Sequence, residues 1–184
     1  LGVLSATDSR LSYYYEGGAT GVAYGTTPTP AEANRLQLGA TDPIYFATID
    51  EACFLKAEAY ARLNDAANAK SNYEEAIRAA FARCGCTGAD ELIAGDYAFT
   101  DGTAEQMVEQ IINHKWASNV RCMPIESWFD MNRTGYPTRG TTITASEGVL
   151  GGFPCRFLYP YNSTDYNPNA PQVEPLTAKM WWHK

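Results

Sequence analysis

Apolar residues recur at three- and four-residue steps along two stretches between residues 44 and 83, which predicts a pair of helices. The first stretch contains Thr48-Ile49-Asp50-Glu51, the pattern of a capping box, although a start one turn earlier also fits. The second follows a break at Asn64-Asp65, where Asp65 is the expected N-cap, and Gly85 fits a left-handed stop. The residues expected to face the core are Ile49, Ala52, Cys53, Ala57, Tyr60 and Ala61 on the first helix, and Ala69, Tyr73, Ala76, Ile77 and Ala80 on the second.

Two more helices are expected between residues 103 and 135. The segment Thr103-Ala104-Glu105-Gln106 is a second capping box, and the helix that it opens should end near Asn119 or Val120. A short helix follows and ends at Gly135, a residue suited to the left-handed conformation. The apolar side of the longer helix is formed by Met107, Val108, Ile111, Ile112 and Trp116.

The remaining stretches are rich in residues that interrupt regular structure. Residues 1–43 contain Tyr13-Tyr14-Tyr15 and then closely spaced glycines and prolines, which favours a packed loop over a short strand or a binding surface. Residues 86–102 are expected to form a connection. From residue 136 onward the pattern predicts loops with β-prone pieces such as 141–144, anchored near the end by Met180-Trp181-Trp182. The expected fold class is mainly α, with a helical hairpin scaffold, long irregular loops and little β structure.

Composition and charge exclude several classes of protein. The chain has 184 residues, of which 45% are hydrophobic, enough for one domain with its own core. A formal net charge of -7 and scattered basic residues argue against nucleic-acid binding, which needs clustered Lys and Arg. No apolar run approaches the roughly 18 residues of a membrane-spanning helix. The first residues lack the charged region of a signal peptide, so the N-terminus is expected to be a cut end.

The cysteine pattern gives no clear site. The five cysteines are an odd number, so at least one thiol stays unpaired. The segment Cys84-Gly85-Cys86 is compatible with a strained bridge or with metal ligation, but zinc needs more ligands and both histidines lie far away in sequence. We therefore expect neither a bound metal nor a cofactor.

The predicted helix pair has the spacing of one tetratricopeptide repeat. Small residues such as Ala57, Ala69 and Ala76 let the two helices approach, while Tyr60 and Tyr73 fill the gaps beside them. A generic helical hairpin is the simpler interpretation of this segment taken alone. A single repeat cannot bury both of its faces, so further partners are expected from elsewhere in the chain or from additional sequence.

Four segments, in order along the chain, resemble motifs of the SusD/RagB family, the surface nutrient-binding lipoproteins of Bacteroidota. The third, Glu126-Ser127-Trp128-Phe129-Asp130-Met131-Asn132-Arg133-Thr134-Gly135-Tyr136-Pro137, is similar to the signature E-x-W-x-D-x-R-R-x-G-x-P. Its main departure is Asn132, where the signature has the first of two arginines. The other segments are 51–59 (EACFLKAEA), 111–116 (IINHKW) and 154–160 (PCRFLYP). The residues that the resemblance marks as structural are Glu126, Trp128, Asp130, Arg133, Gly135, Arg156, Tyr159 and Pro160.

The resemblance implies an architecture and a role. Such proteins have a scaffold of tetratricopeptide-like repeats and a loop-rich region that presents the ligand site. The full protein is a lipid-anchored lid on the extracellular face of the outer membrane, and it captures glycans, or sometimes peptides, for a TonB-dependent SusC-like transporter. Full-length members are far longer, so residues 1–184 are expected to be the C-terminal part of one SusD-like domain, with the lipid anchor on an N-terminal part. Within it we expect a helix pair (44–83), signature helices (103–135) and a loop-rich tail (136–184).

The charged residues of the signature are expected to be structural. Glu126, Asp130 and Arg133 are spaced so that they share one face of a helix. Two carboxylates beside an arginine also suggest glycoside hydrolysis, but such groups more often form ion-pair networks. We therefore expect them to fasten the short helix to the C-terminal loops. No nucleophile elbow, phosphate-binding loop or metalloprotease motif occurs, so the chain is not expected to be an enzyme.

Ligand contacts are expected from aromatic side chains in the loops, since an aromatic face stacks on a sugar ring and its polar tip forms hydrogen bonds. The candidates are Tyr13, Tyr14, Tyr15, Tyr136, Tyr161 and Tyr166. The leading hypothesis is noncovalent capture of an oligosaccharide or polysaccharide. Two alternatives stay open, a helical-repeat scaffold that binds a protein or peptide partner and, less favoured, a glycoside hydrolase.

Overall fold

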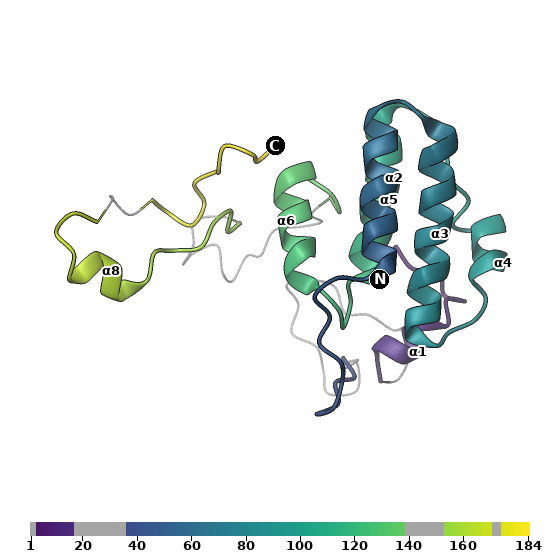
Figure 1. The fold of residues 1–184 in the computed structure, drawn as a ribbon, viewed down its shortest axis with the longest axis horizontal. Helices are drawn as coiled ribbons and strands as arrows, with labels where there is room; N and C mark the ends of the chain where they lie inside the picture. Colours follow the sequence, from purple (N-terminus) through teal and green to yellow (C-terminus); the bar gives the residue numbers. More distant parts are fainter. Residues whose placement is uncertain (1–2, 17–35, 139–152, 171–173) are drawn as a thin grey trace.

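The computed structural model describes residues 3–16, 36–138, 153–170 and 174–184, and within these ranges it is helical without a β-strand. Three long helices lie side by side, with α6 beside them near the C-terminal segment (Figure 1). The expectation of a mainly α fold is confirmed. The helices are α1 (Arg10–Tyr14), α2 (Ile49–Arg62), α3 (Ala66–Cys84), α4 (Ala89–Ala94), α5 (Ala104–Ser118), α6 (Pro124–Thr134) and α8 (Tyr161–Asp165).

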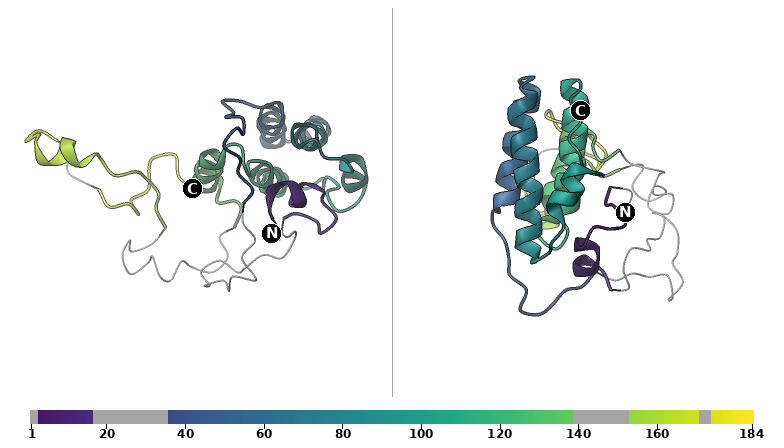
Figure 2. Two further views of the ribbon diagram at one scale, coloured as in Figure 1. Left: turned by 90° about the horizontal axis from the view of Figure 1, so that it is seen from below. Right: turned by 90° about the vertical axis from the view of Figure 1, so that its right-hand side faces the viewer.

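The core is a layer of α2 and α3 packed on α5. The first two form the hairpin that the repeat spacing predicts, and α5 packs chiefly against α2 and also contacts α3 and α6. Seen along the helices, α4 and α1 flank this group, whereas α8 stands well away on the C-terminal arm (Figure 2). No described helix is long and apolar enough to cross a lipid bilayer.

Side chains cap the starts of all three long helices as the sequence predicts. The hydroxyl of Thr48 accepts a hydrogen bond from the Glu51 amide at 3.2 Å, so α2 begins at Ile49 and not one turn earlier. Asp65 caps α3, and Thr103 forms a reciprocal capping box at the start of α5. Capping satisfies amide groups that would otherwise lack partners in the first turn.

The ends of two helices depend on glycine. Gly85 after α3 and Gly135 after α6 have φ angles of 65° and 83°, in the left-handed region where other residues are strained. The helix α5 ends at Ser118 with Asn119 as its C-cap, as expected. Local chemistry in the sequence thus determines where these elements stop.

The predicted core positions are confirmed on α3 and largely on α5. Every residue of the expected α3 stripe is fully buried, and so are four of the five expected on α5, while Trp116 is half-buried. The expected face of α2 is partly wrong, because Ile49 is 73% exposed and Ala52 is exposed. The residues that α2 buries are Asp50, Phe54, Ala57, Glu58 and Ala61. Two of these are carboxylates, which hydrophobic periodicity does not detect.

Residues 3–16 pack against the core, in line with the expected packing of this stretch. The guanidinium of Arg10 donates to Asp8 at 2.7 Å and lies over the ring of Phe81 at 4.4 Å. Asp8 also accepts a hydrogen bond from the Tyr97 hydroxyl at 2.7 Å. Because both members of this ion pair are almost completely buried, they tie α1 to the helical body. The sequence pattern missed α1 and α4, since each spans only one or two turns.

Some expectations concern residues that the structure does not describe. The glycines and prolines within 17–35 and the β-prone piece 141–144 lie outside the described residues. The division into a helix pair, signature helices and a loop-rich tail also stays a prediction.

Replacing Asp8 by Asn should destabilise the fold by about 3 kcal/mol, because it leaves the Arg10 guanidinium buried without a counter-charge. Urea unfolding followed by circular dichroism measures the change in the free energy of unfolding. Asp42→Asn is the matched control, since it breaks the more exposed pair with Arg121 and should cost at most about 1 kcal/mol. Equal losses in the two variants would contradict the structural importance of the buried pair.

Candidate functional site

The charged residues of the segment 126–137 join three helices through one network of ion pairs. Arg133 on α6 forms two parallel hydrogen bonds with the Glu58 carboxylate on α2, at 2.5 and 2.8 Å. Its Nη2 also donates to Asp130 at 2.7 Å. The other oxygen of Asp130 lies 2.8 Å from the Lys115 ammonium on α5. Bidentate pairing of this kind fixes the orientation of both groups, so the network sets the position of α6.

Two more residues extend this network at its edges. Arg62, the last residue of α2, also binds Glu58 through Nε at 2.8 Å. Glu51 lies 3.8 Å from the Lys115 ammonium. Glu58, Asp130 and Lys115 are nearly inaccessible to solvent, so each of them needs an opposite charge beside it.

The network shifts the pKa values of its carboxyl groups in opposite directions. Burial alone would raise the pKa of Glu58, but hydrogen bonds and charges from Arg133 and Arg62 outweigh it and hold that pKa below its usual value. Burial raises the pKa of Glu51, with Lys115 opposing the effect and neighbouring acids adding to it. Hydrogen bonds to Glu58 raise the pKa of Arg133, which stays charged. These acids are held as structural counter-ions.

The network fastens α6 to α2 and α5, so the expectation that it fastens α6 to the C-terminal loops is wrong. Trp128 makes that connection instead, since its indole N–H donates to the Pro154 carbonyl at 3.1 Å and its ring packs on Phe157. Glu126 forms no ion pair with any described residue and only adds to the negative charge around Glu51. The indole is therefore one of the links between α6 and the tail.

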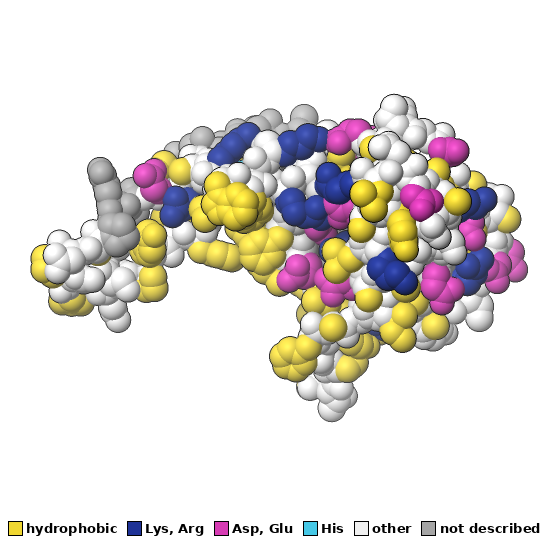
Figure 3. Space-filling view, turned by 45° about the horizontal axis from the view of Figure 1, so that its top comes forward, with side chains coloured by type: hydrophobic (Ala, Val, Ile, Leu, Met, Phe, Trp, Pro, Cys, Tyr) yellow, Lys and Arg dark blue, Asp and Glu magenta, His cyan; other side chains and the backbone are white. Residues whose placement is uncertain are grey.

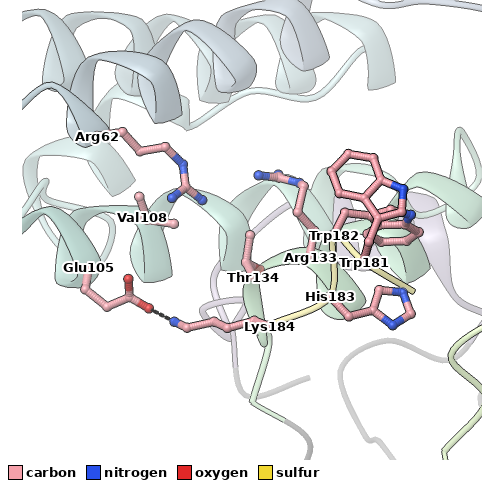
Figure 4. A pocket seen from close by; sticks show the side chains of 9 residues that line it. All are labelled: Arg62, Glu105, Val108, Arg133, Thr134, Trp181, Trp182, His183 and Lys184. Atoms are coloured by element: carbon pink, nitrogen blue, oxygen red, sulfur yellow. Dashed lines mark hydrogen bonds and ion pairs between the residues drawn. The ribbon is translucent and has the colours of Figure 1, made fainter. Parts of the chain in front are cut away.

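A pocket of about 340 Å³ opens beside this network, between the ends of three helices and the C-terminal segment (Figure 4). The helix α2 supplies Arg62, α6 supplies Arg133 and Thr134, and α5 supplies Glu105 and Val108. Residues 181–184 form the opposite wall. In Figure 4 the two tryptophans lie on one side, with Arg62 and Glu105 facing them across the cavity.

The two tryptophans of this wall differ in their environment. Trp182 packs against Phe129 of α6 and against His183, with ring centroids 6.2 and 4.1 Å apart. Trp181 is 92% exposed, so the expectation that it anchors the tail is wrong. An indole that the fold leaves in solvent beside a pocket is available to stack on a ligand.

Polar contacts close the lower side of the pocket. The Lys184 ammonium forms an ion pair with Glu105, drawn as a dashed line in Figure 4. The hydroxyl of Tyr136 donates to the same carboxylate at 3.1 Å, and Lys184 lies over the Tyr136 ring at 5.4 Å. The pocket therefore combines flat aromatic surface with several hydrogen-bond donors, which suits a polar ligand that has an apolar face.

The structure separates the six tyrosines proposed for ligand contact into three places. Tyr13, Tyr14 and Tyr15 lie at the end of α1. Tyr14 is completely buried and cannot offer a ring face to a ligand, so its inclusion is wrong. Tyr13 is half-buried under the Arg121 guanidinium at 4.4 Å, and Tyr15 is half-buried in an isolated bridge with Leu36. These contacts favour a packing role for the run.

The other three tyrosines are more accessible. Tyr136 adjoins the pocket through Glu105, as described above. Tyr161 and Tyr166 are exposed on and just after α8, far from the pocket on the C-terminal arm (Figure 1). Whether any of them contacts a ligand stays a prediction.

The structural residues predicted for the tail lie on the same arm. Pro160 is the N-cap residue of α8, Tyr159 is exposed and Arg156 is half-buried. None of the three joins an ion pair within the described part of the chain.

Sequence reasoning missed most of the pocket. Arg62, Glu105 and Lys184 come from segments far apart in the chain and belong to no common motif. Trp181-Trp182 was the only available signal, because two adjacent indoles cannot both be buried easily in a short terminal segment.

The structure supplies no metal site among the residues it describes. All five cysteines are free thiols, and no group of three or more His, Cys, Asp or Glu in the described ranges could hold an ion. The expected absence of a cofactor stays a prediction.

The helical hairpin and the helices that pack on it define a helical-repeat protein. The chain belongs to the SusD-like family described as "Starch-binding associating with outer membrane", whose model matches residues 5–160. The resemblance to SusD/RagB proteins is thus confirmed. The family comprises non-catalytic binding proteins, which confirms the prediction that the chain is not an enzyme. The comparison with curated proteins found no match.

Solved structures agree on the fold. The chain is similar to a SusD homologue from Bacteroides thetaiotaomicron VPI-5482, with a TM-score of 0.72 and 22% identity, over 97% of this chain and 49% of that one. A SusD homologue from Bacteroides uniformis ATCC 8492 matches with a TM-score of 0.61 and 22% identity, over 83% of this chain and 40% of that one. This chain therefore spans half or less of the length of these relatives.

Glu58→Gln should make the free energy of unfolding less dependent on pH in acid. Because the folded-state pKa of Glu58 lies below its unfolded value of 4.5, its contribution is present above that value and is lost as pH falls through the folded pKa. We expect the free energy of unfolding of the unmodified chain to fall more steeply than that of the variant between about pH 5 and 3. Urea unfolding at a series of pH values measures both slopes.

Glu74→Gln is the control for this experiment. Glu74 also lies on a helix beside an arginine, but it is 21% exposed, and its partners Lys70 and Arg78 are 58% and 41% exposed. Its variant should keep the unmodified slope, because exposed pairs contribute at most about 1 kcal/mol. A Glu58→Gln profile parallel to that of the unmodified chain would refute the network as a source of stability.

Proposed function

We propose that this chain forms part of a cell-surface protein that captures a glycan noncovalently at the outer membrane. Two observations support the proposal, the family's description as starch-binding and associated with the outer membrane, and the pocket beside α6. The single observation that carries it is the exposed indole of Trp181 at the mouth of a cavity with polar walls. An arrangement of this kind binds a sugar ring through its apolar face and its hydroxyl groups.

The capture step requires no chemistry. A pyranose ring would stack on Trp181, while hydroxyl groups would accept hydrogen bonds from Arg62 and donate to Glu105. The carboxylates of the network, Glu58 and Asp130, are turned inward and bound to cations, so they are unavailable as acid and base. Release then depends only on the strength of these reversible contacts.

The partners proposed here are those that the family resemblance implies. We propose delivery of the glycan to a TonB-dependent SusC-like transporter, from a lipid-anchored position on the extracellular face. A further part of the same protein would complete the domain and carry the anchor. The chain's coverage of less than half of its solved relatives supports this division.

Binding of a peptide or protein is the second candidate function. The observation that favours it is a run of exposed apolar side chains before and at the start of α2, at Ile44, Phe46 and Ile49. Exposed apolar residues close together often mark a protein contact. The run is separate from the pocket, so both functions are compatible with one molecule.

A glycan-array and peptide-library screen of the full-length protein tests both candidates, and titration calorimetry then measures the affinity for the best ligand. Trp181→Ala should weaken glycan binding roughly tenfold, the equivalent of about 1.4 kcal/mol of lost stacking. Phe46→Ala is the matched control for glycan binding, because Phe46 is an exposed aromatic residue that does not line the pocket. Binding of peptides alone would replace the leading candidate by the second.

A further inference from the structure

The charges that line the pocket are unequally exposed. Three cations reach its surface, with the side chain of Arg62 49% exposed, that of Arg133 35% and that of Lys184 56%. Glu58 and Asp130, which balance the arginines, lie behind them and are only 6% and 7% exposed. Glu105 is the exposed acid of the lining, at 51%. A ligand that enters the pocket therefore meets three cations and one carboxylate before it meets Glu58 or Asp130.

Arg62 has hydrogen-bonding capacity left. Its Nε and Nη2 contact Glu58, whereas its Nη1 has no partner among the described residues. In Figure 4 its guanidinium points into the cavity, and the Arg133 side chain lies between it and the two tryptophans. A guanidinium with free N–H groups binds a carboxylate or a sulfate more strongly than a neutral hydroxyl.

The distribution of basic side chains over the surface, and not the net charge, favours binding of an anion. On the face shown in Figure 3, basic side chains gather beside hydrophobic ones between the helical body and the C-terminal arm. The chain as a whole has a net charge of -7, which repels polyanions in general. Affinity for an anion would thus have to come from the exposed cations of the pocket, Arg62, Arg133 and Lys184, and not from the overall charge.

We propose that the pocket selects acidic glycans, in which a carboxylate or sulfate group on a sugar ring binds Arg62 while the ring stacks on Trp181. This inference rests on the proposed glycan-binding function and adds a substrate class to it. Lys184 provides a second cation near the same anion, although its pairing with Glu105 reduces its share. The neutral polysaccharide starch lacks the group that this cluster would recognise.

The test compares three probes on the full-length protein by titration calorimetry, namely oligogalacturonate, a sulfated oligosaccharide and maltoheptaose. We expect at least one acidic probe to bind at least tenfold more tightly than maltoheptaose. Arg62→Gln should weaken that acidic probe about tenfold, because a charge-assisted hydrogen bond is lost, and Arg62→Lys should recover part of the loss. The two acidic probes show whether a carboxylate or a sulfate is preferred.

Arg78→Gln is the matched control. Arg78 is also a half-exposed helical arginine with acidic partners, Glu74 and Asp90, but it lies on α3 outside the pocket. Arg78→Gln should leave the affinity for the acidic probe unchanged. Because both variants remove one positive charge, the comparison separates recognition in the pocket from the effect of net charge. Tighter binding of maltoheptaose, or equal effects of Arg62→Gln and Arg78→Gln, would overturn the acidic preference and leave glycan capture standing. Failure of every glycan to bind would overturn both the acidic preference and the proposed glycan capture.

Discussion

The buried carboxylate of Glu58 is the constraint on which the rest of this structure depends. A charge removed from water must be paired, and the arginines of the described residues that reach it come from the end of α2 and from α6. The α6 arginine also holds Asp130, which in turn meets Lys115 of α5. Loss of any one of these charges would leave its partner buried without an opposite charge. The three helices therefore depend on one another for charge pairing.

The pocket is a consequence of this arrangement. Because the carboxylates face inward, the arginines that neutralise them lie at the surface between α2 and α6 with part of their guanidinium groups exposed. Trp128 on the same helix holds the tail through the Pro154 carbonyl, and the Asn132 carbonyl accepts the Lys184 amide. The helix α6 therefore forms one wall of the pocket and positions the opposite wall, residues 181–184. The signature residues on α6 are structural, and they also shape the pocket.

Local signals in the sequence predicted local features well. The caps at Thr48, Asp65 and Thr103 and the stops at Gly85 and Gly135 follow from chemistry within one turn. The α3 stripe was correct because its buried side chains are apolar. The face of α2 was partly wrong because Asp50 and Glu58 are buried only through arginines on other helices. Pocket residues such as Trp181 were also missed, because only the tertiary fold brings these distant segments together.

The departure at Asn132 follows from the same balance of charge. Glu51, Asp130 and Glu58 face Lys115, Arg133 and Arg62, so three acids already meet three cations. Residue 132 is buried, and its amide donates to the Trp128 carbonyl at 3.0 Å. Among the described residues no fourth acid forms an ion pair with this network, so an arginine here would add an unpaired fourth cation to a buried site, at a cost of several kcal/mol. Arg62 supplies the second guanidinium on Glu58, so a neutral residue at position 132 leaves the network complete.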